Sequence, residues 1–136
     1  MTAIEDVMEA VKVRLETLSG VRAYFEEPEL ATGAAAAAVI AYAGTAYDAV
    51  QDGQASDVNL TVTMLVPKTA DRTAKLRLYA FADPTRGAAG SVRTAINGTL
   101  GSEVDFATVT NSGGVSAYPL DGGEMLGIEF TVSVAV

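Results

Sequence analysis

The chain has 136 residues, of which 49% are hydrophobic and 19% are charged, and this composition is typical of one folded domain. It contains no Cys, His or Trp, and its 17 acidic and 9 basic residues give a formal net charge of −8. The missing residue types exclude disulfide scaffolds, His- or Cys-ligated metal sites and catalysis by Ser-His-Asp or Cys-His groups. The acidic balance also argues against a nucleic-acid reader, which presents a basic surface.

The first third of the chain predicts a helix followed by a short strand. Thr2 and Glu5 have the spacing of a capping box, and Gly20 stands where a glycine ends a helix. Between them one helical stripe is apolar: Ile4, Val7, Met8, Val11, Leu15 and Leu18. Residues 21–25 then alternate between apolar and polar side chains and predict a strand.

Residues 34–43 can be read in two ways. Their alanines favour a helix, but the flanking glycines and the segment Val39–Tyr42 favour a strand. We predict a strand over residues 36–43 that is buried on both faces. Residues 44–57 then form a polar hairpin arm with a tight turn at Asp52-Gly53, and the alternation over residues 58–66 predicts a half-buried strand.

The second half predicts two helices and then strands. A helix over residues 72–82 has a wide apolar stripe suited to lying on a sheet, made of Leu76, Leu78, Tyr79, Phe81 and Ala82. Ser91 caps a third helix that runs to Gly101. Strands follow at 104–108, 115–118 and 126–136, with turns at residues 111–114 and 121–123.

This element order predicts a single α+β domain over residues 1–136, with an antiparallel sheet, a long hairpin arm and helices packed on one face. The opening residues have no basic segment, so we expect no signal peptide. No apolar run approaches the ~20 residues that span a membrane, so we expect no membrane association. No pattern indicates a catalytic residue, a cofactor or a metal, and we expect a protein that is not an enzyme.

Charge is unevenly distributed along the chain. Residues 67–100 hold six basic side chains against two acidic ones, whereas every other segment is net acidic. This pattern fits either a solvated helical face or a basic surface that meets an acidic surface of a neighbouring subunit. Tyr47 in the arm fits either a partner anchor or a local contact at the hairpin base. The candidate interface residues are Tyr47, Asp48, Asp52, Asp57, Lys68, Arg72, Lys75, Arg77, Arg86 and Arg93.

Four segments together resemble the tail terminator family of long-tailed bacteriophages, especially phages of actinobacteria. They are Leu15–Arg22, the strand Val58–Val66 with Pro67, the stretch from Asp71 through Asp83-Pro84 and Gly87 to Ser91–Ile96, and Gly123–Val134. Each motif is weak by itself, but their order and spacing extend over nearly the whole chain. The alanine run Ala34–Ala38 departs from the family pattern.

The resemblance implies a virion protein, made in the bacterial cytoplasm, that assembles into a hexameric ring. Such a ring caps the head-proximal end of the tail tube, stops its growth and joins the tail to the head connector. It implies three partners: further copies of the chain, the tail tube protein and the head connector or stopper protein. DNA passes through the ring without specific binding, and the arm at residues 44–57 would order on assembly. Two alternatives remain: another head–tail connector or neck subunit, and a monomeric ligand-binding α+β domain.

Overall fold

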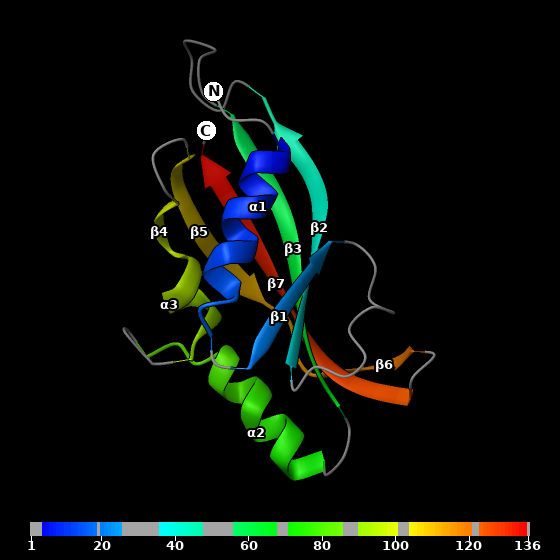
Figure 1. Cartoon of the computed structure of the whole chain (residues 1–136). Helices are drawn as coiled ribbons and strands as arrows, with labels where there is room; N and C mark the ends of the chain where they lie inside the picture. Colours follow the sequence, from blue (N-terminus) through cyan, green and yellow to red (C-terminus); the bar gives the residue numbers. More distant parts are fainter. Residues whose placement is uncertain are drawn as a thin grey trace.

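The computed structural model describes residues 4–18, 20–25, 36–47, 56–67, 71–85, 90–100, 104–120 and 123–135. In chain order the elements are α1 (Ile4–Leu15), β1 (Val21–Phe25), β2 (Ala36–Ala46), β3 (Asp57–Pro67), α2 (Asp71–Phe81), α3 (Val92–Ile96), β4 (Gly98–Leu100), β5 (Val104–Ser112), β6 (Ser116–Leu120) and β7 (Gly123–Ala135). The strands form one sheet in the order β1-β2-β3-β7-β5-β4, with β6 also paired to β7 (Figure 1). The fold is α+β, as the sequence predicts.

The sheet is antiparallel except at one edge. All its pairs are antiparallel apart from β1 and β2, which run parallel. The expectation of a wholly antiparallel sheet is therefore wrong at this edge. Parallel neighbours need a long crossover instead of a tight turn, and the sequence between the two strands has no hairpin signal. The connecting residues 26–35 lie outside the described part of the chain.

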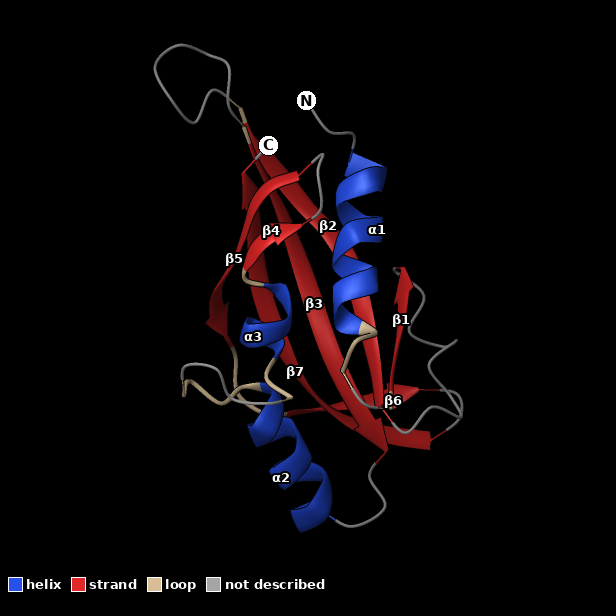
Figure 2. Cartoon of the chain, turned by 60° about the vertical axis from the view of Figure 1, so that its left-hand side comes forward, coloured by secondary structure: helices blue, strands red, loops and turns tan. Residues whose placement is uncertain are grey.

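The helices cover one face of the sheet and build the main core. Figure 2 shows α1 and α3 against this face, with α2 at its lower end. One continuous cluster joins buried side chains of all three helices to the sheet, and the helical contributions are Val7, Val11, Leu15, Ala74, Leu78, Phe81, Val92 and Ile96. Full burial of one large aliphatic side chain stabilises the fold by about 1.5–3 kcal/mol. The predicted packing of helices on one face is confirmed.

The first helix is shorter than the apolar stripe suggests. It ends at Leu15, and the next turn is tighter, with Leu18 N–H donating to the Leu15 carbonyl at 3.1 Å. Leu18 is still buried, and Gly20 adopts a φ of +75°, which glycine takes without strain. The helix thus ends before the predicted stop at Gly20, which lies instead in the turn that leads into β1. Thr2 of the expected capping box lies outside the described residues.

The hairpin strands β2 and β3 run further than expected. Residues 36–40 are buried, as predicted, but the expected burial of residues 41–43 is wrong, because Ala41 is half-buried and Tyr42 and Ala43 are exposed. The strand β2 continues to Ala46, which pairs with Asp57. Gly44 does not end the strand: it has a φ of +120° and accompanies a register shift between Tyr42 and Gly44. A glycine at a bulge keeps the ladder going where another residue would be strained. The predicted arm is described only at its base, because residues 48–55 lie outside the described part.

The third helix is much shorter than predicted. Ser91 caps it, with the Thr94 N–H donating to Ser91 Oγ at 3.3 Å, but the helix ends at Ile96. Asn97 Oδ1 accepts a hydrogen bond from Val109 N–H at 2.7 Å, which ties this turn to β5. Gly98–Leu100 then form the edge strand β4 instead of a helical turn. The side chain of Asn97 thus competes with the helix, a tendency the apolar spacing does not reveal.

The predicted turn at residues 111–114 is also wrong. β5 continues through Ser112, and Gly113 N–H donates to the Glu129 carbonyl at 2.8 Å. After a break, β6 pairs with the first half of β7, so β5 and β6 follow one side of the same long strand. The β7 prediction is confirmed and extended, because the strand covers Gly123–Ala135.

Candidate interaction surfaces

The structure distributes the predicted interface residues over several surfaces. Tyr47 follows β2 and is 78% exposed, and Asp57 begins β3 opposite Ala46 and Ala135. Lys75 is exposed on α2, Arg93 is exposed on α3, and Arg77 is half-buried. Arg72 lies in the first turn of α2, but its side chain is not described, and Asp48, Asp52, Lys68 and Arg86 lie outside the described residues. The candidates that the structure describes therefore belong to β3, α2, α3 and the residue after β2.

The outer side of α2 carries two large apolar side chains that the sheet does not cover. Leu76 is 55% exposed and Tyr79 is 54% exposed, one helical turn apart, and Lys75 is exposed beside them. Among the α2 side chains that the structure describes, Ala74, Leu78 and Phe81 are buried in the core. The prediction that Leu76 and Tyr79 face the sheet is wrong, because α2 packs on the sheet through one narrow side. We call Lys75, Leu76 and Tyr79 the α2 ridge.

A hollow lies between α1 and the edge strand β1. It has a volume of about 400 Å³ and is lined by Glu5, Met8, Glu9 and Phe25, which we call the α1–β1 pocket. Glu5 and Glu9 are exposed, Met8 is half-buried, and Phe25 is 37% exposed. Lys12 Nζ lies 5.3 Å from the centroid of the Phe25 ring, a cation–π contact that fixes the ring beside α1. The pocket combines an apolar floor with an acidic rim.

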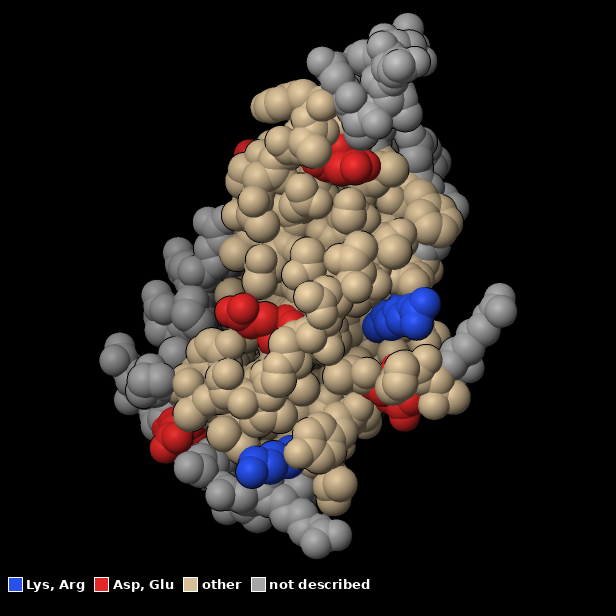
Figure 3. Space-filling model, turned by 180° about the vertical axis from the view of Figure 1, so that it is seen from behind, with Lys and Arg blue, Asp and Glu red and all other residues tan. Residues whose placement is uncertain are grey.

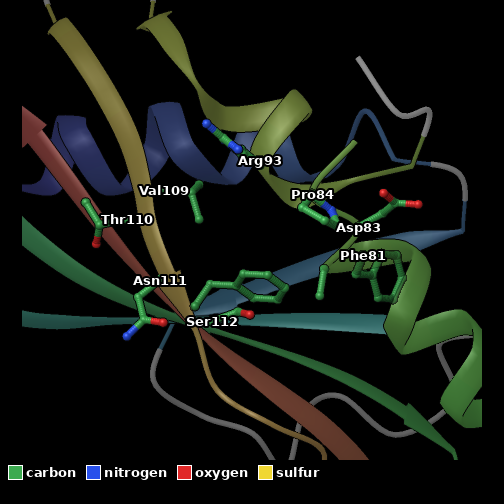
Figure 4. A pocket seen from close by; sticks show the side chains of 10 residues that line it. Phe81, Asp83, Pro84, Arg93, Val109, Thr110, Asn111 and Ser112 are labelled. Carbon is green, nitrogen blue, oxygen red and sulfur yellow. The ribbon is translucent and has the colours of Figure 1, made fainter. Parts of the chain in front are cut away.

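A second hollow of about 310 Å³ lies where α2 ends, beside α3 and β5. Figure 4 shows Phe81, Asp83 and Pro84 on one side and Arg93 with Val109–Ser112 on the other. Asp83 Oδ1 accepts a hydrogen bond from Thr85 N–H at 2.8 Å, and this bond lowers the pKa of the Asp83 carboxyl. The carboxylate therefore stays ionised across the neutral range, and its hydrogen bond stabilises the turn after α2. This α2–β5 pocket is where the ligand-binding alternative would place its ligand.

The face of the sheet opposite the helices is mostly uncharged and carries scattered charged groups (Figure 3). Strand registers put Asn59, Thr61 and Thr63 of β3 beside Ser133, Thr131 and Glu129 of β7 on this open face. Phe106 of β5, 52% exposed, lies in register with Ala135 at one end. The lower end of this face is apolar, where Ala37, Val39, Leu65 and Met125 form a second small buried cluster.

Tyr118 packs against this small cluster, and its pKa is raised. Its half-buried side chain packs against the cluster, and its hydroxyl bonds to the Glu129 carboxylate. Burial, followed by the negative charge and the hydrogen bond of Glu129, raises the pKa of Tyr118 above its ordinary value of 10.0. The neutral phenol is thus favoured in the folded protein, because ionisation would place two negative charges together.

We expect this tyrosine to make stability depend on alkaline pH. The unfolded state loses the tyrosine proton near pH 10.0, before the folded state does, so the free energy of unfolding falls as the pH rises from there. The variant Tyr118→Phe should lack this part of the fall, and Glu129→Gln should reduce it. Urea unfolding at several pH values between about 9 and 11 measures the effect. Equal slopes for wild type and Tyr118→Phe would contradict it.

Comparison with known proteins adds no assignment. No protein-family model matches the chain, and a search of curated proteins finds no significant match. Within the described residues, no group of three or more acidic side chains is placed to hold a metal ion. None of the helices in that same part of the chain has the length and apolar character needed to cross a membrane.

Proposed function

We propose that this chain is a structural subunit of a long-tailed bacteriophage, and that it forms a ring on the head-proximal end of the tail tube. The ring stops tube growth and joins the tail to the head connector. Support comes from the resemblance of four sequence segments to tail terminators and from an α+β fold that agrees with it. DNA passes through the ring without specific binding, as a subunit with a net charge of −8 favours.

The observation that carries the proposal is the presence of separate apolar surfaces on one small subunit. The α2 ridge lies at one end of the molecule, while Tyr47 and Phe106 are exposed near the opposite end, where β2 ends and β5 begins (Figure 1). Exposed apolar groups that gather in patches mark interaction sites. A ring subunit needs two different surfaces for its neighbours and further surfaces for the tube and the connector.

Electron microscopy of tail tubes tests this proposal directly. The purified protein is added to tail tubes of the phage, and the tube ends are imaged. We expect a ring at one end only, and tubes capped in this way should stop elongating when tube protein is added. Tubes that elongate normally and carry no density at either end would contradict the proposal.

The two alternatives differ from it in partner or in assembly state. A neck subunit would be captured by the head connector and not by tube protein, so a pull-down against each separates the two structural roles. A monomeric ligand-binding domain would bind its ligand in the α2–β5 pocket. It would remain a monomer in static light scattering, both with and without tail tubes. Substitution of Asn111, which lines that pocket and is not a candidate interface residue, should leave tube capping intact if the structural role holds.

A further inference from the structure

We propose that adjacent subunits join head-to-tail by docking the α2 ridge of one copy into the α1–β1 pocket of the next. This pairing rests on the proposed ring and names the surfaces that close it. The occupant of the pocket is thus a second copy of this chain.

The α2 ridge has the composition of an interface anchor. Tyr79 and Leu76 are each more than half exposed, although both are large enough to stabilise the fold if they were buried. Tyrosine is among the residues that contribute most to binding when it enters a desolvated pocket. Lys75 adds a positive charge at the edge of this apolar pair, and Arg72 lies one helical turn before Leu76.

The α1–β1 pocket has the complementary properties. Its floor of Met8 and Phe25 is apolar, and its volume of about 400 Å³ can accept an aromatic side chain. Glu5 and Glu9 place two carboxylates at its rim, and Lys12 is engaged over the Phe25 ring. A basic, aromatic ridge therefore meets an acidic, apolar hollow, so charge and hydrophobicity both match.

The two surfaces lie on different parts of the subunit. Figures 1 and 2 both show α1 alongside the upper and middle part of the sheet and β1 along the lower half, with the arrowhead of β1 reaching the level of α1, while α2 extends from the lower end of the sheet. One copy can therefore offer its ridge to one neighbour and its pocket to another. Contacts of this kind generate closed rings or helical filaments, whereas a patch that binds itself stops at a dimer.

Cysteine cross-linking tests the pairing directly, because the chain has no cysteine of its own. One variant carries Lys75→Cys on the ridge, and the other carries Glu9→Cys at the pocket rim. The two are mixed with a short bis-maleimide, at rising concentration and also on tail tubes. We expect Lys75→Cys to couple with Glu9→Cys in preference to either variant coupling with itself. Absence of this mixed product under both conditions would overturn the pairing.

Matched controls separate a specific contact from random collision. Asp6→Cys replaces Glu9→Cys in one arm, because Asp6 is an exposed acid of the same helix that does not line the pocket. It should yield much less mixed product. Coupling as efficient as that of Glu9→Cys would also overturn the pairing.

Charge reversal gives a second, independent readout. Lys75→Glu and Glu9→Lys should each weaken self-association, and the double variant should recover most of the lost affinity. Sedimentation on tail tubes measures this association. Tyr79→Ala should weaken association by about thirtyfold or more. Unchanged association in all these variants would contradict the pairing.

The outcomes for the pairing and for the proposed function are distinguishable. Capped tubes without the Lys75–Glu9 cross-link would leave the ring in place and reject this interface. The cross-link without any binding to tubes would keep the interface and reject the tail function.

Discussion

Replacing Leu78 with alanine is expected to lower the free energy of unfolding by about 2–5 kcal/mol. Leu78 is fully buried in the main core. Among the buried α2 side chains there, it is larger than Ala74 and smaller than Phe81. The helix extends beyond the end of the sheet (Figure 2), and the side chains around a cavity in a close-packed core relax into it only partly. Urea unfolding followed by circular dichroism measures the loss.

The same helix offers a matched control two residues away. Leu76→Ala removes the same atoms from a side chain that is 55% exposed, so stability should change by no more than about 0.5 kcal/mol. If the α2 ridge binds a neighbouring subunit, Leu76→Ala should instead weaken assembly. Similar losses of stability in the two variants would show that α2 packs differently from the arrangement described.

The contrast between Leu76 and Leu78 also shows that the sequence predicts the position of the helix but not which of its apolar side chains are exposed. Periodicity located α2 almost to the residue, with 72–82 predicted and Asp71–Phe81 observed. It assigned every apolar residue of that stripe to the core, because hydrophobicity alone cannot tell an intramolecular contact from an exposed one. The useful signal was the width of the stripe, which exceeds what one helix side can bury against a sheet end.

Strand prediction succeeded where alternation was long and failed where single residues decide the path. β3 and β7 agree with the predicted strands apart from their extended ends. The errors occur at three residues. Gly44 lies at a bulge through which β2 continues, and Gly113 forms a backbone hydrogen bond to β7 where the sequence predicts a turn. Asn97 ends the third helix and bonds to β5 through its side chain. Glycine and asparagine indicate a turn in sequence, yet each also allows a strand to bend without ending.

The surfaces of the candidate site depended on tertiary arrangement and could not be predicted. The α1–β1 pocket joins Phe25 to Glu5, Met8 and Glu9 from the preceding helix. In the sequence Phe25 simply belongs to a short alternating strand. Its exposure follows from the position of β1 at the sheet edge, which the parallel pairing with β2 determines.

Substituting Gly127 with alanine is expected to cost about 1–3 kcal/mol of stability, since a methyl group does not fit at this position of β7. A Cβ there would lie 2.7 Å from Leu65 Cδ2, 2.8 Å from Tyr118 Cε2 and 2.9 Å from the Met64 carbonyl oxygen. The Tyr118 ring thus lies directly over the glycine, and this contact adds to the pairing of β6 with β7. Thermal and urea unfolding of the variant measure the cost.

The three neighbours differ in how easily they can move, and this difference can be measured. The Leu65 methyl and the Tyr118 ring belong to side chains, whereas the Met64 carbonyl belongs to the backbone of the central strand β3. The double variant Gly127→Ala/Tyr118→Ala should therefore lose less stability than the sum of the single variants, because removal of the ring also removes its clash with the new methyl group. It should still be less stable than Tyr118→Ala, because the backbone contact remains.

Gly113→Ala provides the control for this substitution. Its nearest neighbour would be the Glu129 carbonyl oxygen at 3.9 Å, an ordinary contact, so its stability should stay within about 0.5 kcal/mol of wild type. If Gly127→Ala were as stable as Gly113→Ala, Tyr118 could not be packed on Gly127. Part of the burial that raises the pKa of Tyr118 would then be missing, because this burial includes the contact of the ring with the glycine. The alkaline pH dependence should accordingly be weaker than expected if Gly127→Ala costs no stability.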